Sequence, residues 1–222
     1  MKPLTIIATY LLATSLGPRI TLAVTAPILF AGDIYPIIHY RTSINFKAVW
    51  QFIPWVIAGL ALGAGIGPFI DDRSFKLIIG IIILLMAVII IAQEFNLIHY
   101  TKIQSLPATG GLGIALGFSS IIGNAAGGIS SIYFLGQGTD KKAFIGSSSM
   151  LFSINNMIKL IIYILYWTII TPTTLLMSLS MIPVIVLGTL LSTLLIKFIP
   201  EKIYRFVIIA SILYSGTALL LS

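Results

Sequence analysis

The sequence predicts an all-α fold: a polytopic transmembrane bundle of about seven or eight helices, built from two similar halves and containing one glycine-broken helix. Three observations support this prediction. The 222-residue chain is 58% hydrophobic and only 9% charged, whereas roughly a quarter of the residues in a soluble domain are charged. Apolar runs of membrane-spanning length recur along the chain, and a weak internal repeat relates its two parts.

Each expected helix is an apolar run of about 18 or more residues, the length that crosses a bilayer as a helix. A helix is favoured because it satisfies its own backbone polar groups in a solvent that cannot do so. A shorter apolar piece, 3–17, comes first. The longer runs lie at 20–39, 48–70, 75–93, 109–136, 143–168, 173–197 and 203–221.

The net charge of +7 fits a membrane protein better than a nucleic-acid-binding one. Lysines and arginines stand singly or in pairs at the ends of the apolar runs, as expected for membrane-flanking anchors. The sequence has no basic run with interleaved aromatic residues, so we expect no nucleic-acid partner. The lipid bilayer is the expected partner instead. We expect a multi-pass protein located in the bacterial plasma membrane.

No pattern in the sequence predicts enzyme chemistry. Cysteine is absent, which excludes disulfides and thiolate metal sites. His39 and His99 are isolated at segment ends, unlike the spacing of metal ligands. Asp33 follows a glycine but has no second intramembrane aspartate to complete a protease dyad, and Asp71 and Asp72 lack a second acidic cluster. We therefore expect no catalytic residue, no metal and no cofactor.

The two halves of the chain resemble each other. Pro54–Gly59 and Pro183–Gly188 share the pattern P-x-x-x-x-G at an offset of 129 residues, and an upstream offset of 123 residues pairs Asp33 with Asn156. Similar composition among membrane helices could produce such a match, but the shared order of polar positions favours a true repeat. Transporters are often built from repeats, with the substrate site at their interface. We divide the chain into a first membrane repeat, 1–107, and a second, 108–222.

The second repeat opens with a sequence that weakens a helix inside the membrane. Residues 117–135 read GFSSIIGNAAGGISSIYFL, with Asn124 near the centre. Non-helical backbone survives in the membrane only against protein or a water-filled cavity, and transporters use broken helices to build substrate sites. The run 109–136 either crosses once or returns as a re-entrant hairpin. Both paths leave eight lysines and arginines on one side, so the positive-inside rule does not choose between them.

Asp33 lies well inside the segment 20–39, between Pro27 and Pro36. A charge in this position costs about 2.5–3.5 kcal/mol on insertion scales, so such residues usually face a cavity or a partner. The two prolines should distort the helix around it. Asp33 is therefore either a carboxylate that holds two helices together or a member of an ion pathway, and it is our candidate proton-coupling group.

Lys159 lies about 13 Å along the axis from the end of the segment 143–168, at 1.5 Å per residue, which is farther than a lysine stem can fully snorkel. Asn156 shares its helical face at i, i+3 spacing. Either Asn156 and Lys159 together coordinate an anion, or Lys159 forms a structural ion pair with Asp33. Ser148 lies near the start of the same helix, where N–H groups attract anions, although small residues also allow close packing.

The order of these residues resembles the sulfite exporter TauE/SafE family of membrane permeases. The similar stretches include TAPILFAGDIYPIIHY in the first half, then GFSSIIGNAAGGISSIYFL and KKAFIGSSSMLFSINNMIK in the second. The resemblance covers nearly the whole chain and implies an eight-helix, two-repeat transporter of small anions, often sulfur-containing ones. The family pattern marks five residues of this sequence, namely Asp33, Asn124, Gly127, Asn156 and Lys159.

The chain departs from the family pattern mildly at two places and more strongly at its start. Gly128 stands where many relatives have proline, and Ser147-Ser148 stand near a usual Gly-Thr. The family also has a further glycine-rich segment just before the position of Pro3, whereas this sequence begins at Met1. We therefore expect an additional N-terminal piece of roughly 20–30 residues, the length of one membrane helix.

These observations predict a membrane permease or secondary transporter for a small anion, such as sulfite or an organosulfonate. The alternative is a non-transporting integral membrane subunit or assembly factor. The expected partners are the anionic substrate and lipid, and the sequence is compatible with a homo-oligomer. The predicted substrate-binding residues are Asn124, Gly127, Gly128, Ser148, Asn156 and Lys159, with Asp33 as the proton-coupling group.

Overall fold

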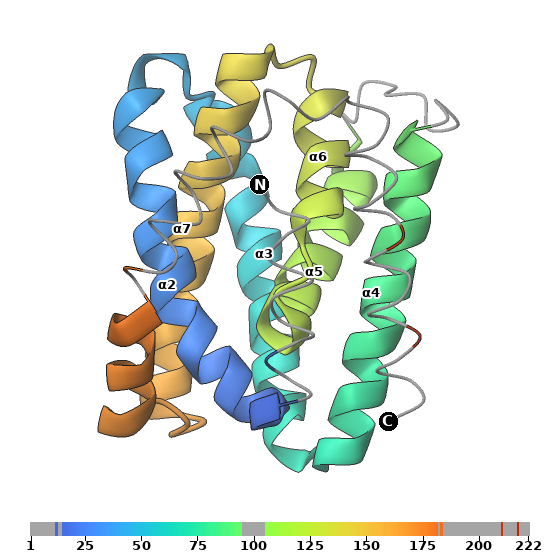
Figure 1. Cartoon of the computed structure of the whole chain (residues 1–222). Helices are drawn as coiled ribbons and strands as arrows, with labels where there is room; N and C mark the ends of the chain where they lie inside the picture. The colour runs from blue at the N-terminus through green and yellow to red at the C-terminus, as the bar shows by residue number, and fades with distance from the viewer. Residues whose placement is uncertain are drawn as a thin grey trace.

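The computed structural model describes residues 15–94 and 105–181, together with residues 12, 183, 210 and 217. Within these residues every regular element is a helix and there is no strand, which confirms the predicted all-α class (Figure 1). Most of the expected segments 3–17, 173–197 and 203–221 lies outside the described residues, as does 184–188 of the match between Pro54–Gly59 and Pro183–Gly188. The two-repeat arrangement therefore stays a prediction.

The described helices follow the predicted runs closely. Four of them are long and apolar enough to cross a membrane, namely Pro18–His39, Phe46–Phe69, Leu106–Gly123 and Lys142–Leu165. A further helical stretch covers 172–181. The elements are α2 (Pro18–His39), η1 (Arg41–Ser43), α3 (Phe46–Ile66), η2 (Gly67–Phe69), α4 (Asp72–Glu94), α5 (Leu106–Gly123), α6 (Gly127–Gly136) and α7 (Lys141–Leu165).

The helices begin where the sequence provides N-terminal signals. The Asn45 side chain accepts a hydrogen bond from Ala48 N–H at 3.1 Å at the start of α3, and Asp140 accepts one from Ala143 N–H at 2.7 Å at the start of α7. Such caps satisfy backbone donors that have no partner inside the helix. Asp71 precedes α4, and hydrogen bonds from the Ser74 side chain and backbone lower the pKa of its carboxyl group, which keeps the cap ionised.

Glycines allow α3 and α5 to pack backbone against backbone. A methyl group added at Gly59 would meet the carbonyl oxygen of Ile114, and one added at Gly63 would meet the side chain of Ile121. Gly117 of α5 lies against the α3 backbone in the same way. Both helices carry the G-x-x-x-G spacing that brings membrane helices close together. Because position 59 pairs with 114 and 63 with 121, α3 and α5 run in the same direction.

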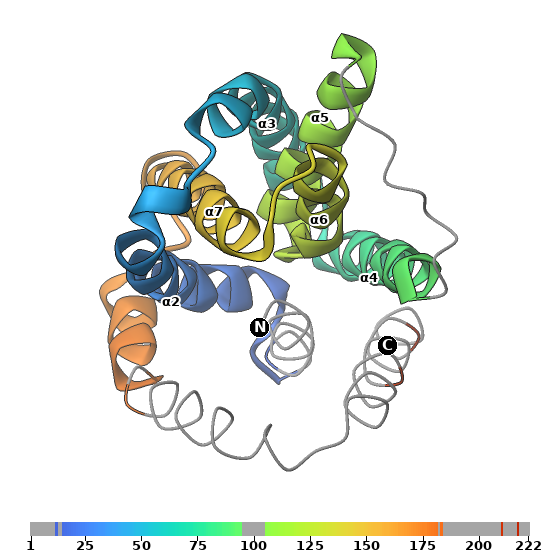
Figure 2. The ribbon, with the colours of Figure 1, turned by 90° about the horizontal axis from the view of Figure 1, so that it is seen from above.

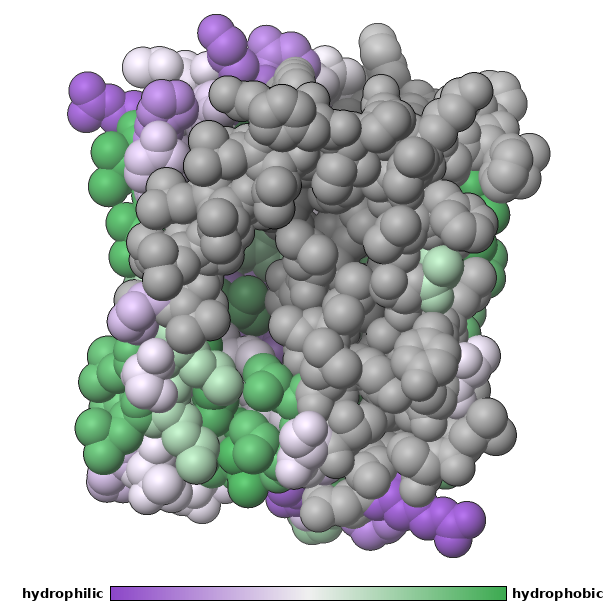
Figure 3. Space-filling model, in the orientation of Figure 1, coloured by the Kyte–Doolittle hydropathy of each residue, from purple (hydrophilic) through white to green (hydrophobic). Residues whose placement is uncertain are grey.

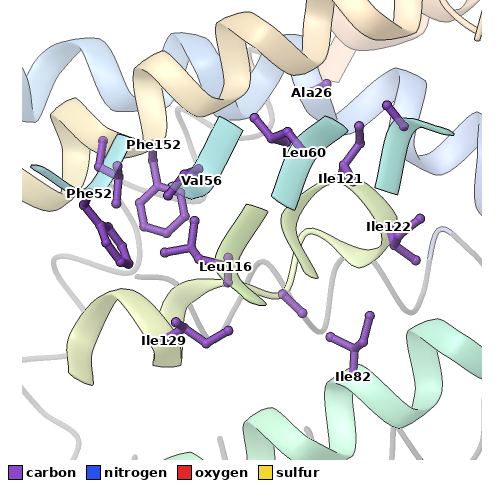
Figure 4. Close-up of a cluster of buried hydrophobic side chains, with 14 of the residues drawn as sticks. Ala26, Phe52, Val56, Leu60, Ile82, Leu116, Ile121, Ile122, Ile129 and Phe152 are labelled. Atoms are coloured by element: carbon purple, nitrogen blue, oxygen red, sulfur yellow. The ribbon is translucent and has the colours of Figure 1, made fainter. Parts of the chain in front are cut away.

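A hydrophobic cluster fills the space between α3, α5, α6 and α7. Figure 4 shows Phe52, Val56 and Leu60 of α3 opposite Leu116 and Ile129 of α5 and α6, all of them buried. The rings of Phe52 and Tyr133 also stack at a centroid distance of 3.8 Å. Close packing of this kind fixes the positions of the helices that carry the polar residues described below.

The segment 109–136 turns back instead of continuing across. α5 ends at Gly123, Asn124 and the next two residues are not helical, and α6 begins at Gly127. The Tyr133 hydroxyl near the end of α6 donates to the Ala48 carbonyl in the first turn of α3 at 2.9 Å, so α6 runs opposite to α5. Figures 1 and 2 show the resulting hairpin. The predicted broken helix is confirmed, and of its two predicted paths the structure shows the hairpin.

Apart from Lys159, the described basic side chains lie at the two ends of the bundle. Arg41, Lys47 and Lys142 lie at the end where α2 finishes and α3 and α7 begin, whereas Arg19 and Arg73 lie at the opposite end. Arg19 donates to the Ile70 carbonyl at 2.7 Å across the turn between α3 and α4. In the coloured parts of Figure 3, the most hydrophilic residues likewise lie at the two ends, and hydrophobic residues predominate along the left side between them.

Candidate functional site

A partly buried polar cluster forms where α2 and α7 meet the break between α5 and α6. It contains Asp33, Asn124, Asn156 and Lys159, all four of which the sequence identified. Lys159 is completely buried and Asn156 is 3% exposed. Polar groups buried this deeply are costly unless they are hydrogen-bonded, so the contacts of each member determine what the cluster can do.

Asn124 forms the centre of the cluster because it ends α5. Its backbone adopts the left-handed conformation, with φ 53°, and its N–H donates to the Ser120 carbonyl at 3.1 Å while the next residue, Ala125, donates to Ser119 at 3.3 Å. This is the usual helix ending in which a left-handed residue reverses the chain. The Asn124 amide then donates to the Thr25 hydroxyl of α2 at 2.8 Å. The break thus presents an amide side chain to two neighbouring helices.

Lys159 reaches this amide instead of the surface. Its ammonium group donates to the Asn124 side-chain oxygen, and it lies 5.8 Å from the centre of the Tyr163 ring, a distance at which a cation is attracted to an aromatic face. The Tyr163 hydroxyl donates to the Ile121 carbonyl at 2.5 Å and so fixes the ring against α5. Lys159 therefore stays inside the bundle, in keeping with its distance from the end of the helix.

Asn156 joins Asp33 to the same group. Its amide donates to the Asp33 carboxylate at 3.0 Å, and Asp33 also exerts an electrostatic attraction on the Lys159 ammonium. The prolines on either side of Asp33 do not end the helix; α2 continues through both and its axis bends (Figure 1). The sequence proposed either an Asn156–Lys159 pair or an Asp33–Lys159 pair, and the structure brings all three side chains into one cluster.

Three further members of the cluster were not predicted as site residues. The Asn155 amide donates to the Ser120 hydroxyl at 2.7 Å, which ties α7 to the last turn of α5. Thr25 accepts from Asn124 while its hydroxyl donates to the Thr21 carbonyl at 2.7 Å. Serine and threonine commonly bond to their own helix backbone, so their sequence positions gave little signal. Asn155 could have been found from its place directly before Asn156 and four residues before Lys159.

The remaining predicted binding residues are Gly127, Gly128 and Ser148. Gly127 and Gly128 form the first turn of α6, and the Gly127 carbonyl accepts from the hydroxyls of Ser130 and Ser131 at 2.8 and 3.0 Å. Ser148 is buried on the face of α7 that also carries Asn155 and Lys159. Among the described side chains, the Ser148 hydroxyl and the Asn155 carbonyl oxygen are buried with no hydrogen-bond partner.

Ser147 and Gly146, which belong to the same small-residue run, serve packing. The Ser147 hydroxyl accepts a hydrogen bond from the Asn45 N–H at 2.8 Å, which joins α7 to the start of α3. A methyl group at Gly146 would lie 3.1 Å from Tyr40. For these two positions the structure favours the packing role over a binding role.

Beside the Asp33 carboxylate, the cluster contains groups that can attract an anion. It combines an ammonium group, amide donors and the N-terminal end of α6, which begins three residues after Asn124 and attracts negative charge through the helix dipole. Discontinuous helices whose N-terminal ends point at anionic groups are a recurring way to bind substrates inside membranes. Among the described residues, no group of three His, Cys, Asp or Glu side chains could hold a metal ion.

Comparison with known proteins identifies the family of the chain. The family model described as Sulfite exporter TauE/SafE matches residues 4–219, nearly the whole chain. Searches of curated proteins and of solved structures give no significant match. The chain is therefore an integral, multi-pass membrane protein that belongs to the sulfite exporter TauE/SafE family, a family of membrane transporters.

Proposed function

We infer that the chain is a cell-membrane permease for a small anion, and that the preferred substrate is a sulfur-containing oxyanion or organosulfonate such as sulfite. Asn124, Asn156 and Lys159 would bind it, with the first turn of α6 and Ser148 completing the site. Family membership supports the transport role and the class of substrate. The residues named here are proposed from the geometry of this chain.

The observation that carries the proposal is the environment of Lys159. A fully buried ammonium group is costly in a membrane, and a structural lysine would ordinarily be paired directly with a carboxylate. Here the ammonium donates to a neutral amide at a helix break, whose oxygen an anion could replace. Since Lys159 and Asn124 are hydrogen-bonded to each other, the anion must displace this hydrogen bond to reach the ammonium group.

Anion flux into proteoliposomes tests the proposal. The purified chain is reconstituted, and uptake of sulfite, methanesulfonate and sulfate is compared with that of protein-free vesicles. We expect flux of sulfite or of the sulfonate above the background. If none of these anions moves through correctly folded protein while it co-purifies with a second membrane protein, the chain is a non-transporting subunit.

Replacing Lys159 tests the assigned binding group. We expect Lys159→Met to weaken the apparent affinity for the anion roughly 10- to 100-fold, because a hydrogen bond to a charged group contributes about 1.5–3 kcal/mol. Lys142→Met is the matched control, since Lys142 is an exposed lysine at the start of the same helix. Wild-type flux from a correctly folded Lys159→Met variant would show that Lys159 is not the anion ligand.

A further inference from the structure

The side-chain amide of Asn155 is hydrogen-bonded at one end only. Its nitrogen donates to the Ser120 hydroxyl at 2.7 Å and lies 3.4 Å from the Asn156 side-chain oxygen. Its oxygen has no hydrogen-bond partner in the described part of the chain, although Asn155 is only 1% exposed. A buried acceptor without a donor costs the desolvation of that group, and such atoms are rare in folded proteins. The oxygen therefore indicates that a donor from a bound molecule occupies this position.

The neighbouring side chains determine which end of the amide carries the oxygen. The Asn156 nitrogen donates to the Asp33 carboxylate at 3.0 Å, and a carboxylate only accepts hydrogen bonds. The Asn156 oxygen is therefore the atom that faces Asn155. Rotating the Asn155 amide would place two oxygens against each other, so the nitrogen stays on this side and the free acceptor lies on the other.

Asn155 lies at the candidate anion site. Its partner Ser120 belongs to the last turn of α5, and Asn124 follows at the break. On α7, Lys159 comes four residues after Asn155. Residues at this spacing share a helical face, with about 5–6 Å between their Cβ atoms. A cation and an unused acceptor therefore lie side by side, within the reach of one small molecule.

This pair of groups discriminates between anions by their hydrogen-bonding capacity. The Lys159 ammonium group only donates, so it favours any anionic oxygen, whereas the Asn155 side-chain oxygen only accepts. An anionic oxygen placed against Asn155 would be repelled and would leave the acceptor unpaired. An O–H group in the same place would donate to it. Sites that hydrogen-bond a hydroxyl group of their substrate reject analogues that lack it.

We propose that Asn155 selects anions that carry an O–H group beside the negative charge, namely hydrogensulfite or a small hydroxyalkanesulfonate. The Lys159 ammonium group binds the anionic oxygens, and the Asn155 oxygen accepts a hydrogen bond from the O–H group. This inference rests on the proposed function and specifies the class of substrate that the site prefers.

Two sulfonates of the same length test the selection. 2-Hydroxyethanesulfonate carries an O–H group where 1-propanesulfonate carries a methyl group, and both keep a single negative charge near neutral pH. Each competes with sulfite, or with methanesulfonate if sulfite does not move, for uptake into proteoliposomes that contain the purified chain. We expect the hydroxyl compound to inhibit about tenfold more strongly in the wild type, because it pairs a buried acceptor that the methyl compound leaves unpaired.

Substitutions on either side of one hydrogen bond separate selection from packing. Asn155→Leu removes the acceptor at similar volume, so the preference should be lost while 1-propanesulfonate still competes. Ser120→Ala is the matched control, because it breaks the same hydrogen bond between α5 and α7 but keeps the Asn155 oxygen. Its inhibition ratio should equal that of the wild type, whatever its total flux. If Asn155 only joined the two helices, both variants would keep the wild-type ratio.

Sulfite itself distinguishes the two sources of the O–H group. On the acid side of neutrality, where hydrogensulfite predominates, sulfite uptake is compared with that of methanesulfonate, and uptake into protein-free vesicles is subtracted. If hydrogensulfite uses Asn155, Asn155→Leu should lower sulfite uptake about tenfold relative to methanesulfonate. A loss of preference for 2-hydroxyethanesulfonate alone would assign the site to hydroxyalkanesulfonates, and a loss for sulfite alone would assign it to hydrogensulfite.

The outcomes separate this inference from the function on which it rests. A wild type that moves anions but shows neither preference overturns the selection and keeps the permease. Unchanged preferences in correctly folded Asn155→Leu overturn the role of Asn155. Absence of flux for every anion overturns the proposed function and this inference together. If Asn155→Leu does not fold, Asn155→Ala removes the same acceptor and is measured in its place.

Discussion

Asn124 combines a backbone requirement with a chemical one. At this position the chain needs a residue that tolerates φ 53°, and the cluster needs an amide that both donates and accepts. Asparagine is one of the few non-glycine residues that adopt the left-handed conformation readily. The helix break and the candidate binding site are therefore produced by the same residue.

Two substitutions at position 124 separate these properties. Asn124→Gly keeps the left-handed backbone but removes the amide, so we expect near-normal thermal stability in detergent with at least a tenfold loss of anion flux. Asn124→Ala removes the amide and also strains the backbone by about 1–2 kcal/mol, so its unfolding temperature should be lower than that of the glycine variant. Equal stability of the two variants would contradict the left-handed ending of α5.

The charged and amide members of the site could be predicted because they stand out in apolar runs. Asp33, Asn156 and Lys159 were identified on that ground, and the structure brings them together. Thr25 and Ser120 could not be identified in this way, since a hydroxyl in a membrane helix is usually satisfied by its own backbone. Their hydrogen bonds to Asn124 and Asn155 depend on which helices are neighbours, and the sequence does not directly predict the neighbours.

At the scale of the helices, glycine determines how closely α3 and α5 approach. We predict that Gly117→Ala destabilises the protein by about 1–3 kcal/mol, the usual effect of overpacking, because the added methyl group would meet the α3 backbone. Gly111→Ala on the same helix is the control. No atom lies within 4 Å of a methyl group there, so its stability should be unchanged or slightly raised. Thermal unfolding in detergent compares the two variants with the wild type.

For the segment 109–136, the sequence predicts the helix break but not the direction of the chain after it. Its glycines and Asn124 correctly indicated a break, because they weaken a helix whatever surrounds it. The direction of the chain after the break depends on packing, namely on Tyr133 returning to the start of α3. The distribution of lysines and arginines does not predict this direction, because both paths place eight of them on one side of the membrane.

For the whole molecule, the hairpin predicts which loops share a side of the membrane. The chain has no cysteine, so single cysteines can report accessibility to a membrane-impermeant thiol reagent. We expect Thr42→Cys and Lys142→Cys to react from one side and Phe69→Cys from the other, since all three positions are exposed and lie at the ends described above. Reaction of positions 42 and 142 from opposite sides would contradict the hairpin.

The close contact of α3 with α5 also limits how the molecule can move. Helices that touch backbone to backbone have little freedom to slide, so these two should travel as a single body during alternating access. The other large contact joins α2 to α7. Between the two pairs, near the break, the hydrogen bonds described above join Asn124, Ser120 and Ile121 of α5 to Thr25 of α2 and to Asn155, Lys159 and Tyr163 of α7. An anion that accepts hydrogen bonds from these donors would weaken the contact between the α3–α5 pair and the α2–α7 pair. Binding of the anion and release of the two helix pairs from each other would then occur in the same step.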